Sequence, residues 1–147
     1  MIASGKSTYT KSMCESGAIS INDDDVVKLV HGGNYLQYQK NLKPLYKAVE
    51  ISILTHAITL NKDIIVDRGL NISKQGRKRF ISLANSFDIP CRAIVFPRSD
   101  YKIHAKRRFD ADSRGHSLEY WEKVAKHHGN IWEDPTLEEG FVDIFYV

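Results

Sequence analysis

Four residues near the start of the sequence, Gly5, Lys6, Ser7 and Thr8, could hold the phosphates of a nucleotide. If a helix starts at this glycine, its first backbone N–H groups and its dipole favour an anion. The Lys6 ammonium group would reach the same phosphates, and the Ser7 hydroxyl group would bind Mg²⁺. The full pattern G-x-x-x-x-G-K-[ST] also needs a glycine five positions before Gly5, which lies outside this sequence. The four residues alone could therefore be a chance match.

Carboxylates follow two short apolar segments. DIIVD ends with Asp67, and a carboxylate at the end of an apolar strand could lie close to a magnesium ion held by the serine. INDDD, residues 21–25, offers carboxylates that could take a proton from an attacking hydroxyl group. Each segment also has a plainer interpretation. Asp67 could cap a turn, and the three adjacent acids could be a solvated helix start.

Arginines gather late in the chain, in the segment RRFDADSRG at 107–115. Arginines on such a polar loop could close over a triphosphate and neutralise the charge that builds up in phosphoryl transfer. By itself the segment could equally be solvated. The four signals occur in the order phosphate loop, acidic turn, acid-ended strand and arginine loop, which is the order in small P-loop kinases. This order favours one nucleotide site over four coincidences.

Taken together, these stretches resemble the P-loop kinases related to the 5′-hydroxyl polynucleotide kinase of bacteriophages, a group of AAA-type predicted kinases. The matching segments are GKST at 5–8, INDDD at 21–25, IVDRGLN at 65–71 and KRRFDADSRG at 106–115. The resemblance implies ATP and Mg²⁺ as cofactors and phosphate transfer to a hydroxyl group. The favoured acceptor is the 5′-OH of a polynucleotide, with single-stranded nucleic acid as a partner. A small-molecule or sugar-nucleotide kinase and an inactive nucleotide-binding module are the alternatives.

The resemblance also implies roles for the residues of the first three segments. The residues of the phosphate loop that would bind the ATP phosphates and Mg²⁺ are Gly5, Lys6, Ser7 and Thr8. Asp24 would be the general base, because it is the second residue after the asparagine of INDDD. Asp67 would help to organise the acceptor hydroxyl group or the metal ion.

The lid and the acceptor site are implied in the same way. The lid residues on the ATP phosphates would be Arg114 and its partner, Arg107 or Arg108. The family's arginine for the phosphate of the acceptor falls near Val27 and Lys28, so this chain departs from the pattern there. The role could have passed to Lys28 or to Arg68, or it could be absent, in which case the acceptor could be a small molecule.

Strand-like and helical segments alternate along the chain. We expect strands at 18–21, 63–67, 91–96 and 142–147, separated by helices that include residues 6–16, 74–87 and 99–109. Strands alternating with helices of this length favour a mainly parallel sheet. With the resemblance, the fold class is α/β, a P-loop NTPase of the nucleoside-kinase-like, three-layer α/β/α type, with residues 1–147 as a single domain.

Two of the expected helices have an apolar face that we expect to form part of the core. A long helix with Pro44 in its first turn has an apolar stripe expected to face inward, made of Leu45, Val49, Ile53, Ala57 and Leu60. In the helix capped by Ser73, the residues expected to face inward are Phe80, Leu83, Ala84 and Phe87. Asp23 is expected to cap a short helix, DDVVKLV at 24–30, which ends before Gly32 and Gly33.

The strand before the phosphate loop is central in this fold, and it is missing from the sequence, like the leading glycine. Its absence would leave two strand edges unpaired, and buried unpaired backbone groups cost about 1–3 kcal/mol each. We therefore expect the chain to be a fragment of a longer product. Alternatively, the sheet is rearranged, or a strand from a second copy fills the gap.

Composition fits an ordinary globular protein, with 42% apolar and 27% charged residues and a net charge of +3. No apolar run is long enough to span a bilayer, and we recognise no signal peptide. We expect reduced thiols at Cys14 and Cys91 and a cytoplasmic location, or the host cytoplasm if the protein is phage-encoded. The basic group of Lys74, Arg77, Lys78 and Arg79 could be a solvated helix face or a nucleic-acid track.

Overall fold

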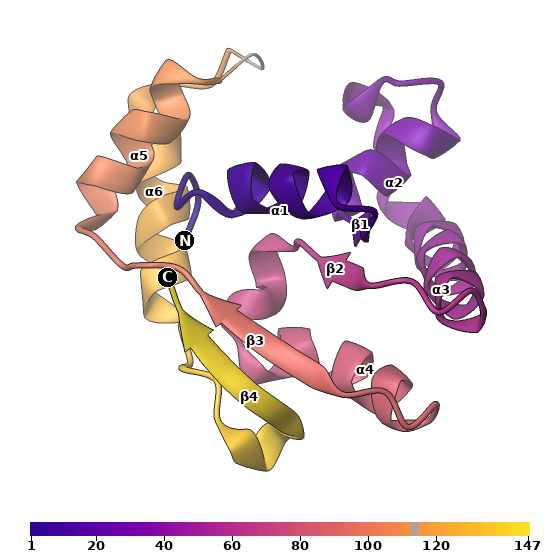
Figure 1. Ribbon diagram of the computed structural model, residues 1–147. Helices are drawn as coiled ribbons and strands as arrows, with labels where there is room; N and C mark the ends of the chain where they lie inside the picture. The colour runs from indigo at the N-terminus through magenta and orange to yellow at the C-terminus, as the bar shows by residue number, and fades with distance from the viewer. Residues whose placement is uncertain (113–114) are drawn as a thin grey trace. The chain divides into compact units, whose positions relative to one another are not determined.

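The computed structural model describes residues 1–112 and 115–147. Backbone contacts divide the chain into two compact units, Ser7–Arg68 and a unit made of Met1–Lys6 with Gly69–Val147. Within the described residues, each unit holds one two-stranded parallel sheet (Figure 1). The single domain over residues 1–147 stays a prediction.

In the unit Ser7–Arg68, two helices follow the first parallel strand along the chain and precede the second. Its elements are α1 (Lys6–Glu15, from Ser7 onward), β1 (Ile19–Ile21), α2 (Asp23–Val30), 3₁₀ turns at Tyr35–Gln37 and Lys40–Leu42, α3 (Lys43–Thr59) and β2 (Ile64–Val66). β1 pairs with β2 from Ile19 opposite Ile64 to Ile21 opposite Val66. Parallel pairing requires a crossover connection, which α2 and α3 provide.

The other unit also contains one parallel strand pair, and a helical hairpin connects its two strands along the chain. Its elements are a 3₁₀ turn at Gly69–Ile72, α4 (Lys74–Asn85), β3 (Cys91–Val95), α5 (Tyr101–Asp110), α6 (Leu118–Asn130), a 3₁₀ turn at Leu137–Glu139 and β4 (Phe141–Tyr146). β3 and β4 are parallel. α5 and α6 lie side by side (Figure 1). Between them they bury Ala105, Trp121 and Ala125.

The predicted strands are confirmed within one residue at each end, and both pairings are parallel, as expected. The four described strands form two separate pairs rather than one sheet. Cys14 and Cys91 are free thiols, as expected. Among the described residues, no helix is both long and apolar enough to cross a membrane.

The predicted inward face of α3 is confirmed in part. Ala57 is buried as predicted, and Val49 and Ile53 are half-buried. Leu45 and Leu60 are 45% and 67% exposed, and the buried residues of α3 are Tyr46, Glu50, Leu54 and Ala57. The helix turns this face inward because Tyr46 packs against Val26 and Val27 of α2. Glu50 follows one helical turn after Tyr46 and is therefore buried on the same face.

Half of the predicted inward face of α4 is confirmed. Phe80 and Ala84 are buried, and Leu83 is half-buried. Phe87 is 41% exposed because α4 ends at Asn85, before this residue. Ser73 caps the helix as predicted, since its hydroxyl oxygen accepts from the backbone N–H of Gly76.

Candidate functional site

The loop Met1–Gly5, which the motif assigns to phosphate binding, contains two residues with a left-handed backbone conformation. Ala3 and Gly5 have positive φ angles of 47° and 97°, and α1 begins directly afterwards at Lys6. Left-handed residues within a turn can direct backbone N–H groups toward a common concavity. At Gly5 this conformation would strain any larger residue, although a Cβ there would meet only Phe96, at 3.8 Å.

Lys6 lies folded over this loop. Its Nζ donates to the carbonyl oxygen of Met1 at 2.5 Å and to Oγ of Ser4 at 3.3 Å. Ser4 Oγ in turn donates to the same carbonyl at 3.1 Å. The ammonium group is therefore held by oxygen atoms of the loop that the motif assigns to phosphate binding.

Two titratable groups beside the loop have lowered pKa values. Burial, followed by Lys6 and Arg98, lowers the pKa of the Met1 amino group to about 5. Burial, followed by the Met1 amino group, His127 and Lys6, lowers the pKa of His128 to about 4. Burial is the largest cause of both shifts, so these two groups have low pKa values mainly because their charged forms lose water.

A carboxylate and two hydroxyl groups meet in the unit Ser7–Arg68. Ser7 Oγ and Thr10 Oγ1 each donate to Oδ2 of Asp67 at 3.4 Å. Ser7 and Thr10 share one face of α1 because they are three residues apart. Asp67 follows β2 and is 9% exposed. The predicted pairing of Ser7 with Asp67 is thus present, while Thr10 was missed; its i,i+3 spacing from Ser7 was the available signal.

Asn22 connects the two acidic segments. Its Oδ1 accepts from the backbone N–H of Asp24 at 2.8 Å, and its Nδ2 donates to the backbone carbonyl of Asp67 at 2.8 Å. Asn22 is the N-cap of α2, so the expected cap at Asp23 is wrong. Asp23 is instead the first helical residue, because the extended backbone of Asn22 places the asparagine oxygen against the first turn.

The two cations expected near the acceptor both face carboxylates. Nε of Arg68 donates to Oδ1 of Asp23 at 2.7 Å and lies 3.6 Å from Oε1 of Glu50. Nζ of Lys28 pairs with Oδ1 of Asp25 at 3.0 Å on the exposed surface of α2. Arg68 is therefore neutralised within the fold, and Lys28 lies next to an acid.

Two of the three predicted lid arginines lie among the residues that the structure describes. Arg107 and Arg108 occupy the last turn of α5, and the Arg108 guanidinium lies 4.8 Å from the centre of the Trp121 ring. Arg114 lies outside the described residues, so its lid role stays a prediction. Arg107 is exposed to solvent.

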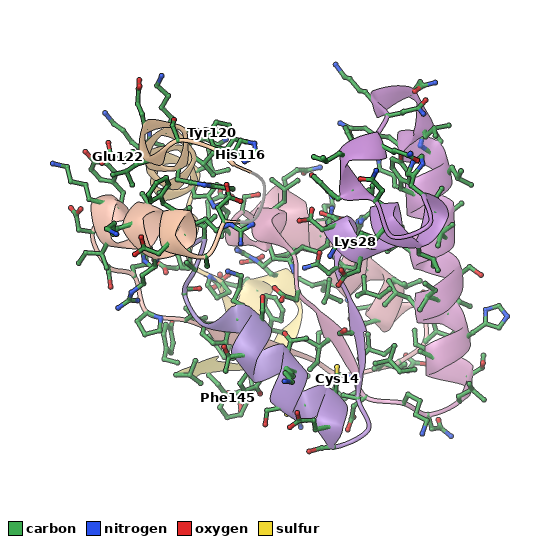
Figure 2. All side chains as sticks on the ribbon, turned by 90° about the horizontal axis from the view of Figure 1, so that it is seen from above. Cys14, Lys28, His116, Tyr120, Glu122 and Phe145 are labelled. Carbon is green, nitrogen blue, oxygen red and sulfur yellow. The ribbon has the colours of Figure 1, made fainter. Side chains whose placement is uncertain are left out.

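Residues on both sides of positions 113 and 114, one within the predicted lid segment and one just after it, contact α6. Oδ2 of Asp112 accepts from the indole N–H of Trp121 at 3.2 Å and from the backbone N–H of His116 at 2.9 Å. His116 stacks on Tyr120 with ring centres 4.3 Å apart, and Figure 2 shows the two side chains next to each other. The position of these residues is thus fixed by aromatic contacts with α6.

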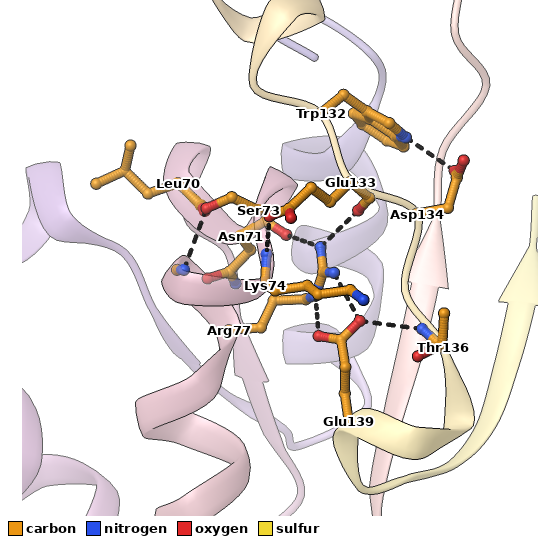
Figure 3. A network of polar contacts seen from close by, with 11 residues as sticks. Leu70, Asn71, Ser73, Lys74, Arg77, Trp132, Glu133, Asp134, Thr136 and Glu139 are labelled. Atoms are coloured by element: carbon orange, nitrogen blue, oxygen red, sulfur yellow. Dashed lines mark hydrogen bonds and ion pairs between the residues drawn. The ribbon is translucent and has the colours of Figure 1, made fainter.

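Arg77 corrects the interpretation of the basic group on α4. Its guanidinium is buried, pairs with both carboxylate oxygens of Glu139 at 2.7 and 2.8 Å, and donates to the carbonyls of Asn71 and Glu133 (Figure 3). The hydrogen bond from Arg77 is the main cause of the lowered pKa of Glu139. Arg77 is therefore neither a solvated residue nor part of a nucleic-acid track, because its donors are used inside the fold.

With this geometry in view, comparison with known proteins assigns the family. The family model described as AAA domain matches residues 1–125. The chain therefore belongs to this AAA domain family, which makes it a P-loop, nucleotide-binding, kinase-like protein with an α/β fold. No individual curated protein matches the chain.

Proposed function

We propose that this protein is an ATP-dependent kinase that transfers the γ-phosphate of ATP to a hydroxyl group. The observation that carries the proposal is the connected set of Ser7, Asp67, Asn22 and Asp24. One hydroxyl group and one carboxylate lie 3.4 Å apart, and the side chain of Asn22 bridges that carboxylate residue to Asp24 with two hydrogen bonds of 2.8 Å. Family membership supports the phosphate-loop half of the assignment.

In the proposed reaction, Lys6 and the backbone N–H groups at Gly5 bind the β- and γ-phosphates, with Thr8 as a further phosphate ligand. Asp24 accepts the proton of the acceptor hydroxyl group as its oxygen bonds to the γ-phosphorus. The bond between the γ-phosphorus and the β,γ-bridging oxygen breaks, and ADP leaves. Arg107, Arg108 and Arg114 are the proposed lid residues, which neutralise charge on the transferring phosphoryl group.

The oxygen atoms of Ser7 and Asp67 fit a magnesium ion. Mg²⁺ prefers oxygen ligands and is typically held by one or two carboxylates together with substrate phosphates. Among the described residues, no group of three or more His, Cys, Asp or Glu side chains could hold a metal by itself. The ion would therefore depend on the nucleotide, to which it would supply charge neutralisation when bound.

The favoured acceptor is the 5′-OH of a polynucleotide. The matching segments of the sequence support it, and so do exposed cations outside the loop. Lys74 and Lys78 line an open groove on α4, and Lys102 is exposed on α5. Such cations could contact the phosphates of a strand.

A small-molecule alcohol is the second candidate, favoured by a different observation. Arg68 and Lys28, the two cations expected to hold the phosphate of an acceptor, face Asp23, Glu50 and Asp25. An acceptor without a phosphate beside its hydroxyl group would need neither cation.

The test measures transfer from γ-labelled ATP to a 5′-OH oligonucleotide, to nucleosides and to a panel of sugars and amino alcohols. Transfer to at least one of them is expected, and Lys6→Ala should abolish it by removing the charge that holds the phosphates. Turnover by Lys6→Ala at the wild-type rate would refute the proposal. An inactive protein that still binds ATP would be a nucleotide-binding module instead.

Salt dependence separates the two acceptors. If a polynucleotide binds, its affinity should fall steeply with salt, and Lys74→Ala with Lys78→Ala should flatten the slope by about one unit per lost contact. Lys123→Ala is the matched control, because this exposed lysine of α6 pairs with Glu119. A slope that is already flat in the wild type would favour the small-molecule acceptor.

A further inference from the structure

Glu50 is a buried acid that the proposed reaction does not use. It lies in the middle of α3 and is only 3% exposed. A charged carboxylate in such a place is costly unless a partner offsets the loss of water. Its Oε1 lies 3.6 Å from Nε of Arg68, whose side chain is 11% exposed. Arg68 is also the residue that directly follows Asp67.

Arg68 reaches from β2 to the first turn of α2. Its Nε–H donates to Oδ1 of Asp23 at 2.7 Å. Asp23 directly follows Asn22, whose own side chain binds the carbonyl of Asp67. Two consecutive residues at the start of α2 are therefore bonded to two consecutive residues after β2. Two such attachments restrict rotation of the helix end, whereas one would leave it free to pivot.

The start of α2 carries the acids of the proposed reaction. Asp23, Asp24 and Asp25 are three adjacent carboxylates in the first turn, where the helix dipole favours negative charge. Arg68 neutralises the first of the three, and Oε1 of Glu50 lies 3.6 Å from the same Nε atom of Arg68. α3 supports the same helix with Tyr46, which packs on Val26 and Val27 one turn before Glu50.

We propose that Glu50 is a positioning residue that acts through Arg68: the chain Glu50–Arg68–Asp23 clamps the first turn of α2 and so holds Asp24 in place for proton transfer. The clamp itself is a property of the fold, while its catalytic consequence rests on the proposed kinase function. Positioning of this kind matters because displacing a reacting group by about 1 Å can cost about 100-fold in rate.

The experiment measures backbone hydrogen exchange over residues 22–27 and steady-state kinetics in the same purified proteins. Glu50→Gln keeps the shape of the side chain and removes its charge. It should reduce the protection of the first turn of α2 and lower kcat up to about 100-fold, with the nucleotide dissociation constant unchanged. Asp23→Asn removes the half-exposed end of the clamp and should act in the same direction, which keeps the test available if Glu50→Gln fails to fold.

A double-mutant cycle identifies action through Arg68. In an Arg68→Met background, Glu50→Gln should cost little further in kcat or protection, because the intermediate link is already gone. Independent, additive effects would overturn the proposal. Glu119→Gln is the control, since it removes an acid from an exposed i,i+4 pair on α6 and should change neither quantity.

The two readouts separate failure of the clamp from failure of the kinase assignment. Unchanged exchange of α2 in both Glu50→Gln and Asp23→Asn would overturn the clamp, whatever the activity. Loss of protection in a protein that phosphorylates no acceptor would support the clamp and refute the kinase. Loss of protection with unchanged kcat would overturn the positioning role.

Discussion

The side-chain amide of Asn22 donates to the backbone carbonyl of Asp67 at 2.8 Å, while its oxygen accepts from the N–H of Asp24 at 2.8 Å. One side chain therefore caps α2 and fastens it to the end of β2. The proposed metal-binding residue and the proposed base are positioned by the same amide group. A substitution that separates the two hydrogen bonds can show what each one contributes.

Asn22→Asp should separate them. Aspartate still accepts from the Asp24 N–H, so the cap remains, but it cannot donate to the carbonyl of Asp67. We expect kcat to fall while the stability of α2 changes little. Asn22→Ala loses both bonds and should also destabilise the protein by about 1 kcal/mol. Urea denaturation together with single-turnover transfer checks this, and equal kcat in the wild type and Asn22→Asp would contradict it.

Asp24→Asn tests the base itself. The substitution keeps the shape of the side chain and removes the proton acceptor, and general-base catalysis typically contributes about 10²–10⁴-fold. We expect kcat to fall by that order, with little change in ATP affinity measured by calorimetry. Loss of activity in Asp23→Asn of the same size, with none in Asp24→Asn, would move the base to Asp23.

Much of the site in the unit Ser7–Arg68 could be predicted from sequence because its chemistry lies at the ends of short elements. Ser7 opens a helix and Asp67 closes a strand, so their residue types and local pattern suffice to place them. The cap at Asn22 was assigned one residue too late, because aspartate and asparagine are equally good caps and both are present. Only the tertiary bond to Asp67 distinguishes them.

The burial of the charged residues Glu50 and Arg77 could not be predicted from sequence, because a charged side chain is ordinarily exposed. No role was predicted for Glu50, which interrupts an apolar helix. Arg77 lies in a basic run and was predicted to belong either to a solvated helix face or to a nucleic-acid track. Each is buried because its partner comes from a segment far away in sequence, Arg68 for Glu50 and Glu139 for Arg77. Periodicity within one helix carries no information about such partners.

Arg77 should be a stability residue rather than a binding residue. Arg77→Met leaves the carboxylate of Glu139 largely buried without its partner, and breaking a buried pair in this way costs about 3–5 kcal/mol. Lys78→Met, next to it on the exposed face of α4, should stay within about 0.5 kcal/mol. Urea denaturation measures both free energies of unfolding. Adding Glu139→Leu to Arg77→Met should recover part of the loss, and no recovery would argue against the ion pair as its cause.

Stability should fall as the solution becomes acidic, partly through His128. Burial and nearby positive groups lower the pKa of His128 from 6.5 to about 4 in the folded state. Between these two values the unfolded chain binds a proton that the folded chain does not, so the free energy of unfolding decreases as the pH falls through this window. Above pH 6.5 the histidine is neutral in both states and adds no pH dependence. The free energy of unfolding should therefore differ less between pH 7.5 and pH 5 in His128→Asn than in the wild type.

His104, whose pKa is also lowered chiefly by burial, should account for part of the difference in free energy that remains. The exposed His56 provides the control, and His56→Asn should keep the wild-type difference. A difference in His128→Asn as large as in the wild type would mean that His128 is protonated equally in the folded and unfolded chains.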